Sequence, residues 1–351
     1  MRRFTCESCA EEVAFDALRC ASCSSPLGYV PAQQAVKVLH PAAGAVSFSI
    51  SGDDAEFWRC PNSARGCNWV LPAGTGDIWC RSCGLTPGRP DETNPDALAA
   101  WSTAEAVKRR LVHQLDHLAL PIDPRSDATP DGLAFDLVYV PGQFGPAGKV
   151  DEAVTLDLAD ADVQDVGAPP RRVHAPFRTL IGNLRHKVGH HYWHRLVGQS
   201  DHVTPFRRLF GDERADYPAA IEPHQAAVAH HWDASRFVTG RAESHPFEDW
   251  AETFAHYLHI LDATDTAEAY RLPDGQCEMG RPQSSPGGGT FAEILRLWRP
   301  TAPAVNALAA SLGLPAVYPF QLTGVVLQKF EFVHARVTAH AHREHFYSVY
   351  P

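Results

Sequence analysis

Apolar residues recur at three- and four-residue steps in three segments of the chain, residues 103–119, 177–197 and 244–263. This spacing gathers apolar side chains on one helix face, so each segment is predicted to be helical. The middle segment contains no proline, and its periodic apolar positions are Leu180, Ile181, Leu184, Val188 and Leu196. In the third segment the apolar face consists of Trp250, Ala251, Phe254, Ala255 and Leu258. The second half of the chain is therefore predicted to be mainly helical.

Cysteines crowd the other end of the chain, where eight of the nine lie before residue 84. Four of them form two Cys-x2-Cys knuckles: Cys6, Cys9, Cys20 and Cys23. A second set has a wider first pair: Cys60, Cys67, Cys80 and Cys83. Two knuckles that face one another supply the four thiolates of a tetrahedral zinc site. Both sets predict structural zinc, because four thiolates leave no open position for a substrate.

These patterns divide the chain into two domains. Residues 1–84 are expected to be a double four-cysteine zinc-ribbon region of small, irregular β-structure, whose folding the metal would support. Residues 85–100 begin with a stretch rich in proline, glycine and polar residues and are predicted to be a linker. Residues 101–351 form the helical domain, with a modest sheet expected from residues 133–140 and 154–162. The predicted fold class is α+β.

Charge and hydropathy exclude several partners. The net charge is −10, and acidic and basic residues balance within the first 90 residues, which argues against binding to nucleic acid. No run approaches the roughly 20 apolar residues that a membrane helix needs. The first residues, MRRFTCESC, contain no apolar core of a secretory signal, so a cytoplasmic location is expected.

The middle predicted helix carries histidines at helical spacing. His186 and His190 are one turn apart, so two imidazoles on one face can hold one zinc ion. The chain has 19 histidines, however, and about one such pair is expected by chance. Two further pairs at this spacing, His113/His117 and His190/His194, are indeed present. The spacing alone is weak, and a third ligand is needed.

The third predicted helix offers such a ligand. Glu248 and Glu252 are four residues apart within a strongly apolar, aromatic segment, where an unpaired carboxylate is costly to bury. Glu248 would complete a site of two histidines and one glutamate that leaves a fourth position for water. Glu252 would accept the free N–H of a ligand histidine. A solvated acidic face is the alternative, and His245 is a rival third ligand.

A family resemblance is carried by motifs along nearly the whole chain. They are CSSPLGYVP, CNWVLP, CRSCGL, EAVKRRLVHQL, FRTLIGNLRHKVGHHYW, LFGDERADY and HPFEDWAETFAHYLHILDATDTA, in this order. With these motifs the chain resembles a bacterial family of zinc-binding metallopeptidases with an N-terminal zinc-ribbon region, similar to gluzincins. The resemblance implies a zincin-like fold, zinc ligands His186, His190 and Glu248, Glu252 behind them, and a peptide or protein as substrate.

The sequence departs from this family at the catalytic position. Lys187 stands where the H-E-x-x-H motif has the glutamate that takes a proton from water and passes it to the leaving amine. An ammonium cannot accept a proton unless burial lowers its pKa by several units, and it repels a metal cation. Arg241 lies near the place where related sites have a tyrosine that stabilises the oxyanion, so it is a second candidate catalytic residue.

Three functions follow from these observations. The first is a zinc-dependent peptidase with an impaired or unusual base. The second is a non-catalytic pseudopeptidase that keeps the groove and binds peptide or protein. The third is an adaptor in which the zinc ribbons carry the function.

Overall fold

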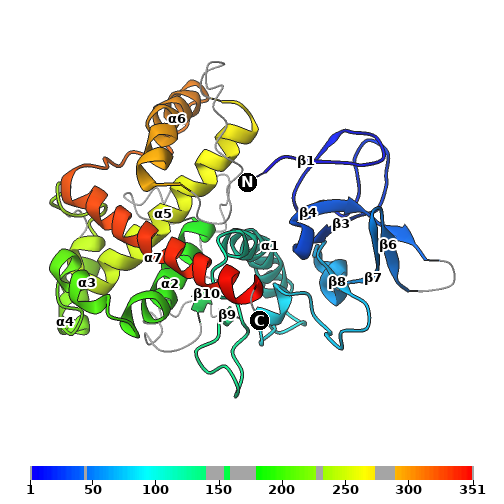
Figure 1. Cartoon of the computed structure of the whole chain (residues 1–351), viewed down its shortest axis with the longest axis horizontal. Helices are drawn as coiled ribbons and strands as arrows, with labels where there is room; N and C mark the ends of the chain where they lie inside the picture. Colours follow the sequence, from blue (N-terminus) through cyan, green and yellow to red (C-terminus); the bar gives the residue numbers. More distant parts are fainter. Residues whose placement is uncertain are drawn as a thin grey trace. The chain divides into compact units, whose positions relative to one another are not determined.

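The structure, a computed structural model, describes residues 2–42, 46–139, 154–158, 179–226, 232–272 and 289–349 (Figure 1). Its contacts divide the chain into two compact units. The first runs to His117 and includes residues 121–148 and 155–163, and the second contains residues 164–351. The predicted domain boundaries at residues 84 and 100 stay a prediction.

The first unit is built from short antiparallel strands, as expected for a zinc-ribbon region. The strands are β1 (Phe4–Thr5), β2 (Glu12–Val13), β3 (Leu27–Val30), β4 (Ala35–Val38), β5 (His40–Pro41), β6 (Phe48–Ile50), β7 (Asp53–Arg59) and β8 (Val70–Pro72). β1 pairs with β2, β3 pairs with β4, and β5-β6-β7-β8 form a four-stranded sheet. Short 3-10 turns at Pro31–Gln33, Pro61–Arg65 and Cys83–Leu85 connect them.

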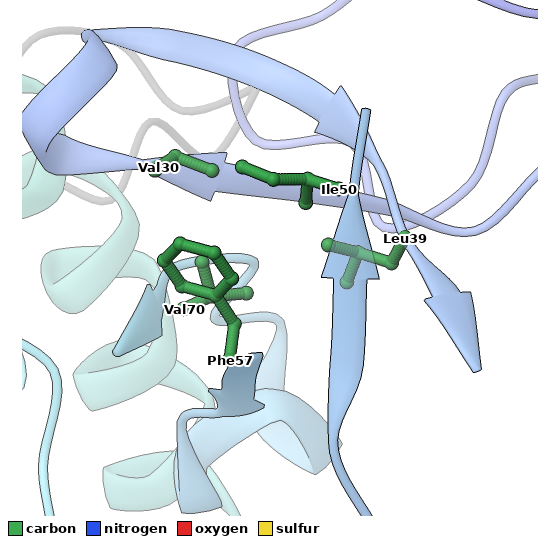
Figure 2. Packing of buried hydrophobic residues seen from close by; sticks show 5 residues of the cluster. All are labelled: Val30, Leu39, Ile50, Phe57 and Val70. Atoms are coloured by element: carbon green, nitrogen blue, oxygen red, sulfur yellow. The ribbon is translucent and has the colours of Figure 1, made fainter. Parts of the chain in front are cut away.

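One apolar cluster lies between these strands. Figure 2 shows its five buried side chains, which are Val30, Leu39, Ile50, Phe57 and Val70. They come from β3, β6, β7, β8 and the chain between β4 and β5. Other side chains of the same region, such as Tyr29 and Trp69, are also buried. Metal binding is expected to contribute further to the folding of such short strands.

Helix α1 (Pro95–His117) belongs to the same unit and packs on the aromatic residues of the ribbon. Its His113 Nδ1 lies 2.6 Å from the Tyr29 hydroxyl, and the Tyr29 ring lies 4.7 Å from the Trp69 ring. His113 is therefore part of a buried aromatic cluster. The Asn94 side chain accepts the backbone N–H groups of Asp96 and Ala97, which caps the start of the helix.

The predicted modest sheet is present as two strands, β9 (Phe135–Val138) and β10 (Val154–Asp157), which pair with one another. Residue 140 and residues 159–162 of the two predicted segments lie outside the described residues.

The second unit is helical. Its elements are α2 (Leu180–Trp193), a π-helical turn (His194–Gly198), α3 (Val203–Phe210), α4 (Tyr217–Ala226), a 3-10 turn (Ala242–Ser244), α5 (Pro246–Ala269), α6 (Phe291–Ser311) and α7 (Gly324–Val349). The predicted helical segments 177–197 and 244–263 correspond to α2 and α5. The predicted fold class, a small zinc-ribbon β region followed by a mainly helical domain, is confirmed. None of the helices in the described ranges has both the length and the hydropathy needed to cross a membrane.

Helices α2 and α5 pack against one another through a close backbone contact (Figure 1). A Cβ atom on Gly189 would lie only 3.0 Å from Cα of Ala251. The indole N–H of Trp250 donates to the carbonyl oxygen of Gly189 at 2.8 Å. Glycine costs helix propensity, but here it lets the two helices approach, which brings the histidine face of α2 to the first turns of α5.

Candidate metal centres

The eight cysteines gather into two clusters, and within each the sulfur atoms lie within 4.8 Å of one another. Closest sulfur distances are 3.6 Å in the first cluster and 3.8 Å in the second. Tetrahedral zinc with Zn–S bonds of about 2.3 Å places its sulfurs about 3.8 Å apart. Disulfide sulfurs lie only about 2.05 Å apart. Both clusters, Cys6/Cys9/Cys20/Cys23 and Cys60/Cys67/Cys80/Cys83, therefore fit a four-thiolate zinc site.

The second cysteine cluster contacts a buried ion pair on α1. Oε2 of Glu105 lies 3.7 Å from Sγ of Cys83, and Nζ of Lys108 lies 2.7 Å from Oε1 of Glu105. Glu105 also accepts the Thr86 hydroxyl at 2.7 Å. Both charged side chains are almost fully buried. Their burial was not predicted from the sequence.

His186, His190 and Glu248 meet at one point in the helical unit. Nε2 of His186 lies 3.3 Å from Oε2 of Glu248, and Nε2 of His190 lies 3.4 Å from Oε1. The two Nε2 atoms are 3.2 Å apart. Tetrahedral zinc with bonds of about 2.0–2.1 Å places its ligand atoms about 3.3 Å apart. The donor set and its spacing fit a zinc ion, and the glutamate is fully buried.

Glu252 lies behind this cluster, one turn further along α5. Its Oε1 lies 2.7 Å from Nδ1 of His186, and its Oε2 accepts the Thr239 hydroxyl at 2.8 Å. A carboxylate at Nδ1 favours the tautomer that leaves Nε2 without a proton, which is the form that a metal ligand requires. The role predicted for Glu252, to accept the N–H of a ligand histidine, stays a prediction, and Thr239 was not foreseen.

Two donors from outside α2 and α5 hold the Glu248 carboxylate. The Arg241 guanidinium donates to Oε2 through Nε, and the Tyr217 hydroxyl donates to Oε1 at 2.5 Å. Arg241, expected to face an oxyanion, thus contacts the third candidate ligand. Tyr217 begins α4 and was missed as a site residue, although it ends the motif LFGDERADY, because nothing in that motif's spacing connects it to α5.

Charge and burial shape the protonation of this cluster. Burial raises the pKa of Glu248, but the charges of Arg241 and His186 outweigh it and hold the pKa well below its usual value. Burial also opposes the ionisation of Glu252, yet the hydrogen bond to His186 lowers its pKa to about 2. Burial and Arg241 act to lower the pKa of His186, while Glu248 and Glu252 raise it overall. Burial lowers the pKa of His190. Both carboxylates are therefore ionised at neutral pH.

Lys187 follows His186 on α2 and is half-buried. No hydrogen bond or ion pair joins its ammonium group to another side chain within the described residues. Burial and the charge of Arg241 lower the pKa of Lys187, and Glu248 opposes this shift. Lys187 therefore lies within electrostatic reach of the cluster.

His245, the rival third ligand, is used elsewhere. Its Nδ1 accepts the backbone N–H of Phe247 at 3.1 Å and caps α5, with Pro246 in the first helical position. Its Nε2 donates to the carbonyl oxygen of Ala215 at 3.1 Å. Both ring nitrogens are occupied, which leaves Glu248 as the third member of the cluster.

Comparisons with known proteins identify a family for each part of the chain. Residues 97–336 match a family model described as "Putative zinc-binding metallo-peptidase", and residues 3–94 match a zinc-ribbon domain model. Uncharacterized proteins of Mycobacterium tuberculosis and Mycobacterium bovis are each 38% identical over 342 residues, which cover 96% of this chain and 95% of the relative. No solved structure matches the chain.

Proposed function

This chain belongs to the family of zinc-binding metallopeptidases, and from that premise we propose that it binds zinc and peptide at His186, His190 and Glu248 and cleaves peptides poorly. The observation that carries the proposal is the convergence of the two Nε2 atoms with the buried Glu248 carboxylate. The two cysteine clusters would hold structural zinc ions. A peptide or protein partner and a cytoplasmic location stay predictions.

The side chains at this site are expected to have different roles. His186, His190 and Glu248 would hold the ion, and Glu252 fixes the tautomer of His186. When bound, zinc supplies a Lewis acid that polarises a peptide carbonyl and makes a water molecule more acidic. Lys187 occupies the position from which a carboxylate would accept the proton, and its ammonium form has no lone pair for this task. Losing such a base typically costs about 10²–10⁴-fold in rate.

A second function, a non-catalytic pseudopeptidase, is favoured by the same lysine. A cation that follows a ligand histidine opposes both proton transfer and metal binding, and binding a peptide without cleaving it requires no proton transfer. The adaptor function requires only the zinc ribbons.

Zinc content per chain tests the metal site. Elemental analysis of the wild type should give three zinc ions, and His186→Ala should give two. Two ions in both proteins would leave only the cysteine clusters and would overturn the proposed third site.

Peptide hydrolysis tests the role of Lys187. Slow cleavage by the wild type that is lost in His190→Ala and rises about 10²-fold or more in Lys187→Glu supports an impaired peptidase. No cleavage by the wild type combined with a gain in Lys187→Glu supports the pseudopeptidase. Fast wild-type cleavage that Lys187→Glu does not improve contradicts both.

A further inference from the structure

The site contains two cations that come from separate elements. Lys187 lies on α2, and Arg241 directly precedes the 3-10 turn before α5. Lys187 directly follows His186, whose Nε2 lies 3.3 Å from Oε2 of Glu248, and Arg241 donates to that same oxygen. Both cations therefore adjoin the same cluster. A family site with glutamate at position 187 would have one cation and one further carboxylate instead.

The carboxylates of the site are already occupied and turned inward. Glu248 is 0% exposed and accepts from Tyr217 and Arg241. Glu252 is engaged with His186 and Thr239. Neither acid is available to attract a positively charged ligand.

The cations, in contrast, retain capacity. The Arg241 side chain is 42% exposed, and its contact with Glu248 uses Nε, which leaves further guanidinium donors. Lys187 is half-buried, and no side chain among the described residues pairs with it. Among the described residues, the charge that is still available to a ligand at this site is therefore positive.

Charge balance leads to the same conclusion. With neutral histidines, the carboxylates of Glu248 and Glu252 balance Lys187 and Arg241. A bound divalent ion would leave two positive charges uncompensated in a largely buried site, which is energetically costly. A carboxylate of the ligand would compensate one of these charges and so reduce the cost.

We propose that Lys187 and Arg241 form a receptor for a carboxylate of the bound peptide, so that this protein selects acidic peptide ligands. The inference rests on the proposed function in so far as the ligand is a peptide at this site. Arginine offers a carboxylate a planar pair of donors, and lysine offers a point charge. The carboxylate can come from an aspartate or glutamate side chain or from the peptide C-terminus.

Fluorescence anisotropy of three peptides, each blocked at its N-terminus, tests whether the full-length protein has this receptor. The first carries glutamate side chains and an amidated C-terminus, and the second carries glutamine side chains and a free C-terminus. The third, with glutamine side chains and an amidated C-terminus, is the neutral reference. We expect the first or the second to bind at least tenfold more tightly than the third, and the tighter one identifies the source of the carboxylate.

Variants of single charges locate the effect. Lys187→Met keeps most of the aliphatic stem. It should lose about tenfold in affinity for whichever carboxylate-bearing peptide the wild type binds more tightly, and its affinity for the neutral reference peptide should be unchanged. Lys187→Glu should abolish the preference. Arg214→Gln removes a 68%-exposed cation of the same helical unit and should change nothing. Raising the salt concentration should shrink the wild-type preference, a readout that depends on no variant.

Equal binding of the three peptides, no binding of any, or a preference that survives in Lys187→Met would overturn the receptor. Its failure is distinguishable from that of the proposed function, because zinc content is measured separately. Two zinc ions per chain with a Lys187-dependent preference would retain the receptor and reject the third zinc site. Three zinc ions with no preference would do the reverse.

Discussion

The cysteine clusters and the histidine–glutamate cluster both have the spacing of zinc ligands, but different groups hold them together. In the first unit the sulfurs of each cluster face mainly one another. In the helical unit the Glu248 carboxylate already has a guanidinium and a phenol as partners. We therefore expect a metal to be a folding requirement in the first unit and a removable ligand in the helical unit.

Both units have large fully buried side chains, Tyr29 and Trp69 in the first and Tyr192, Trp250 and Phe254 in the helical one. The strands of the first unit are short, however, and each cysteine cluster joins segments that are separate in the sequence, so loss of the ion is expected to loosen them. In the helical unit α5 packs directly against α2, α6 and α7. Its fold is expected to persist when the ion leaves.

Metal removal should have the largest effect. A strong chelator should unfold the ribbon strands β3–β8, because zinc binding to such small sites contributes on the order of 10 kcal/mol to folding. Helices α2 and α5 should keep their structure. Hydrogen exchange with mass spectrometry reports both regions in one experiment, and Cys80→Ser should reproduce part of the loss. An equal loss of protection from hydrogen exchange in α5 would contradict the expected difference between the two units.

Acid should destabilise the helical unit through His256. Burial lowers the pKa of this histidine to about 4, and its Nδ1 lies 3.0 Å from the Tyr318 hydroxyl. Below pH about 6.5 the unfolded chain binds the proton more readily than the folded one, so stability falls between pH about 6.5 and about 4 and is fully present above. The total loss is roughly 3 kcal/mol.

Urea unfolding followed by helical circular dichroism, in chelator to exclude zinc, measures this slope. His256→Gln should flatten it, whereas His40→Gln, at an exposed ribbon position, should not. An unchanged slope in His256→Gln would assign the acid sensitivity to another group.

The smallest effect is expected from a single methyl group at Gly189. Gly189→Ala would place Cβ 3.0 Å from Cα and 3.1 Å from the carbonyl oxygen of Ala251, forcing α2 and α5 apart at a cost of about 2 kcal/mol. Because His190 and Glu248 lie on these helices, the third zinc ion should also bind more weakly. The control is Gly88→Ala, which meets no atom closer than 3.9 Å. A third-site zinc content unaltered by Gly189→Ala would separate helix spacing from metal binding.

The sequence revealed those parts of the sites that repeat at fixed spacing. Paired cysteine knuckles, His186 and His190 one turn apart, and two acids in an apolar helix all follow from local periodicity. Tyr217 and Thr239 did not follow, because they reach the cluster from segments whose path depends on tertiary packing. Arg241 was noticed by position, but its carboxylate partner required the three-dimensional structure.

The burial of charged side chains was also not predictable from the sequence. Glu105 and Lys108 resemble ordinary surface charges in a helical pattern, yet they neutralise one another beside Cys83. Sequence spacing reports which face a residue occupies, and it does not report what covers that face.

Helix α1 has a practical consequence for anyone who dissects this chain. The family match begins at residue 97, which invites expression of a shortened fragment that starts there. Such a fragment would lack Tyr29, the partner of His113, and it would expose the buried ion pair between Glu105 and Lys108 to water. A truncation at residue 97 would thus expose apolar surface and a buried ion pair of α1 to water. The protein with its N-terminal region intact is therefore the better material for assays of the helical unit.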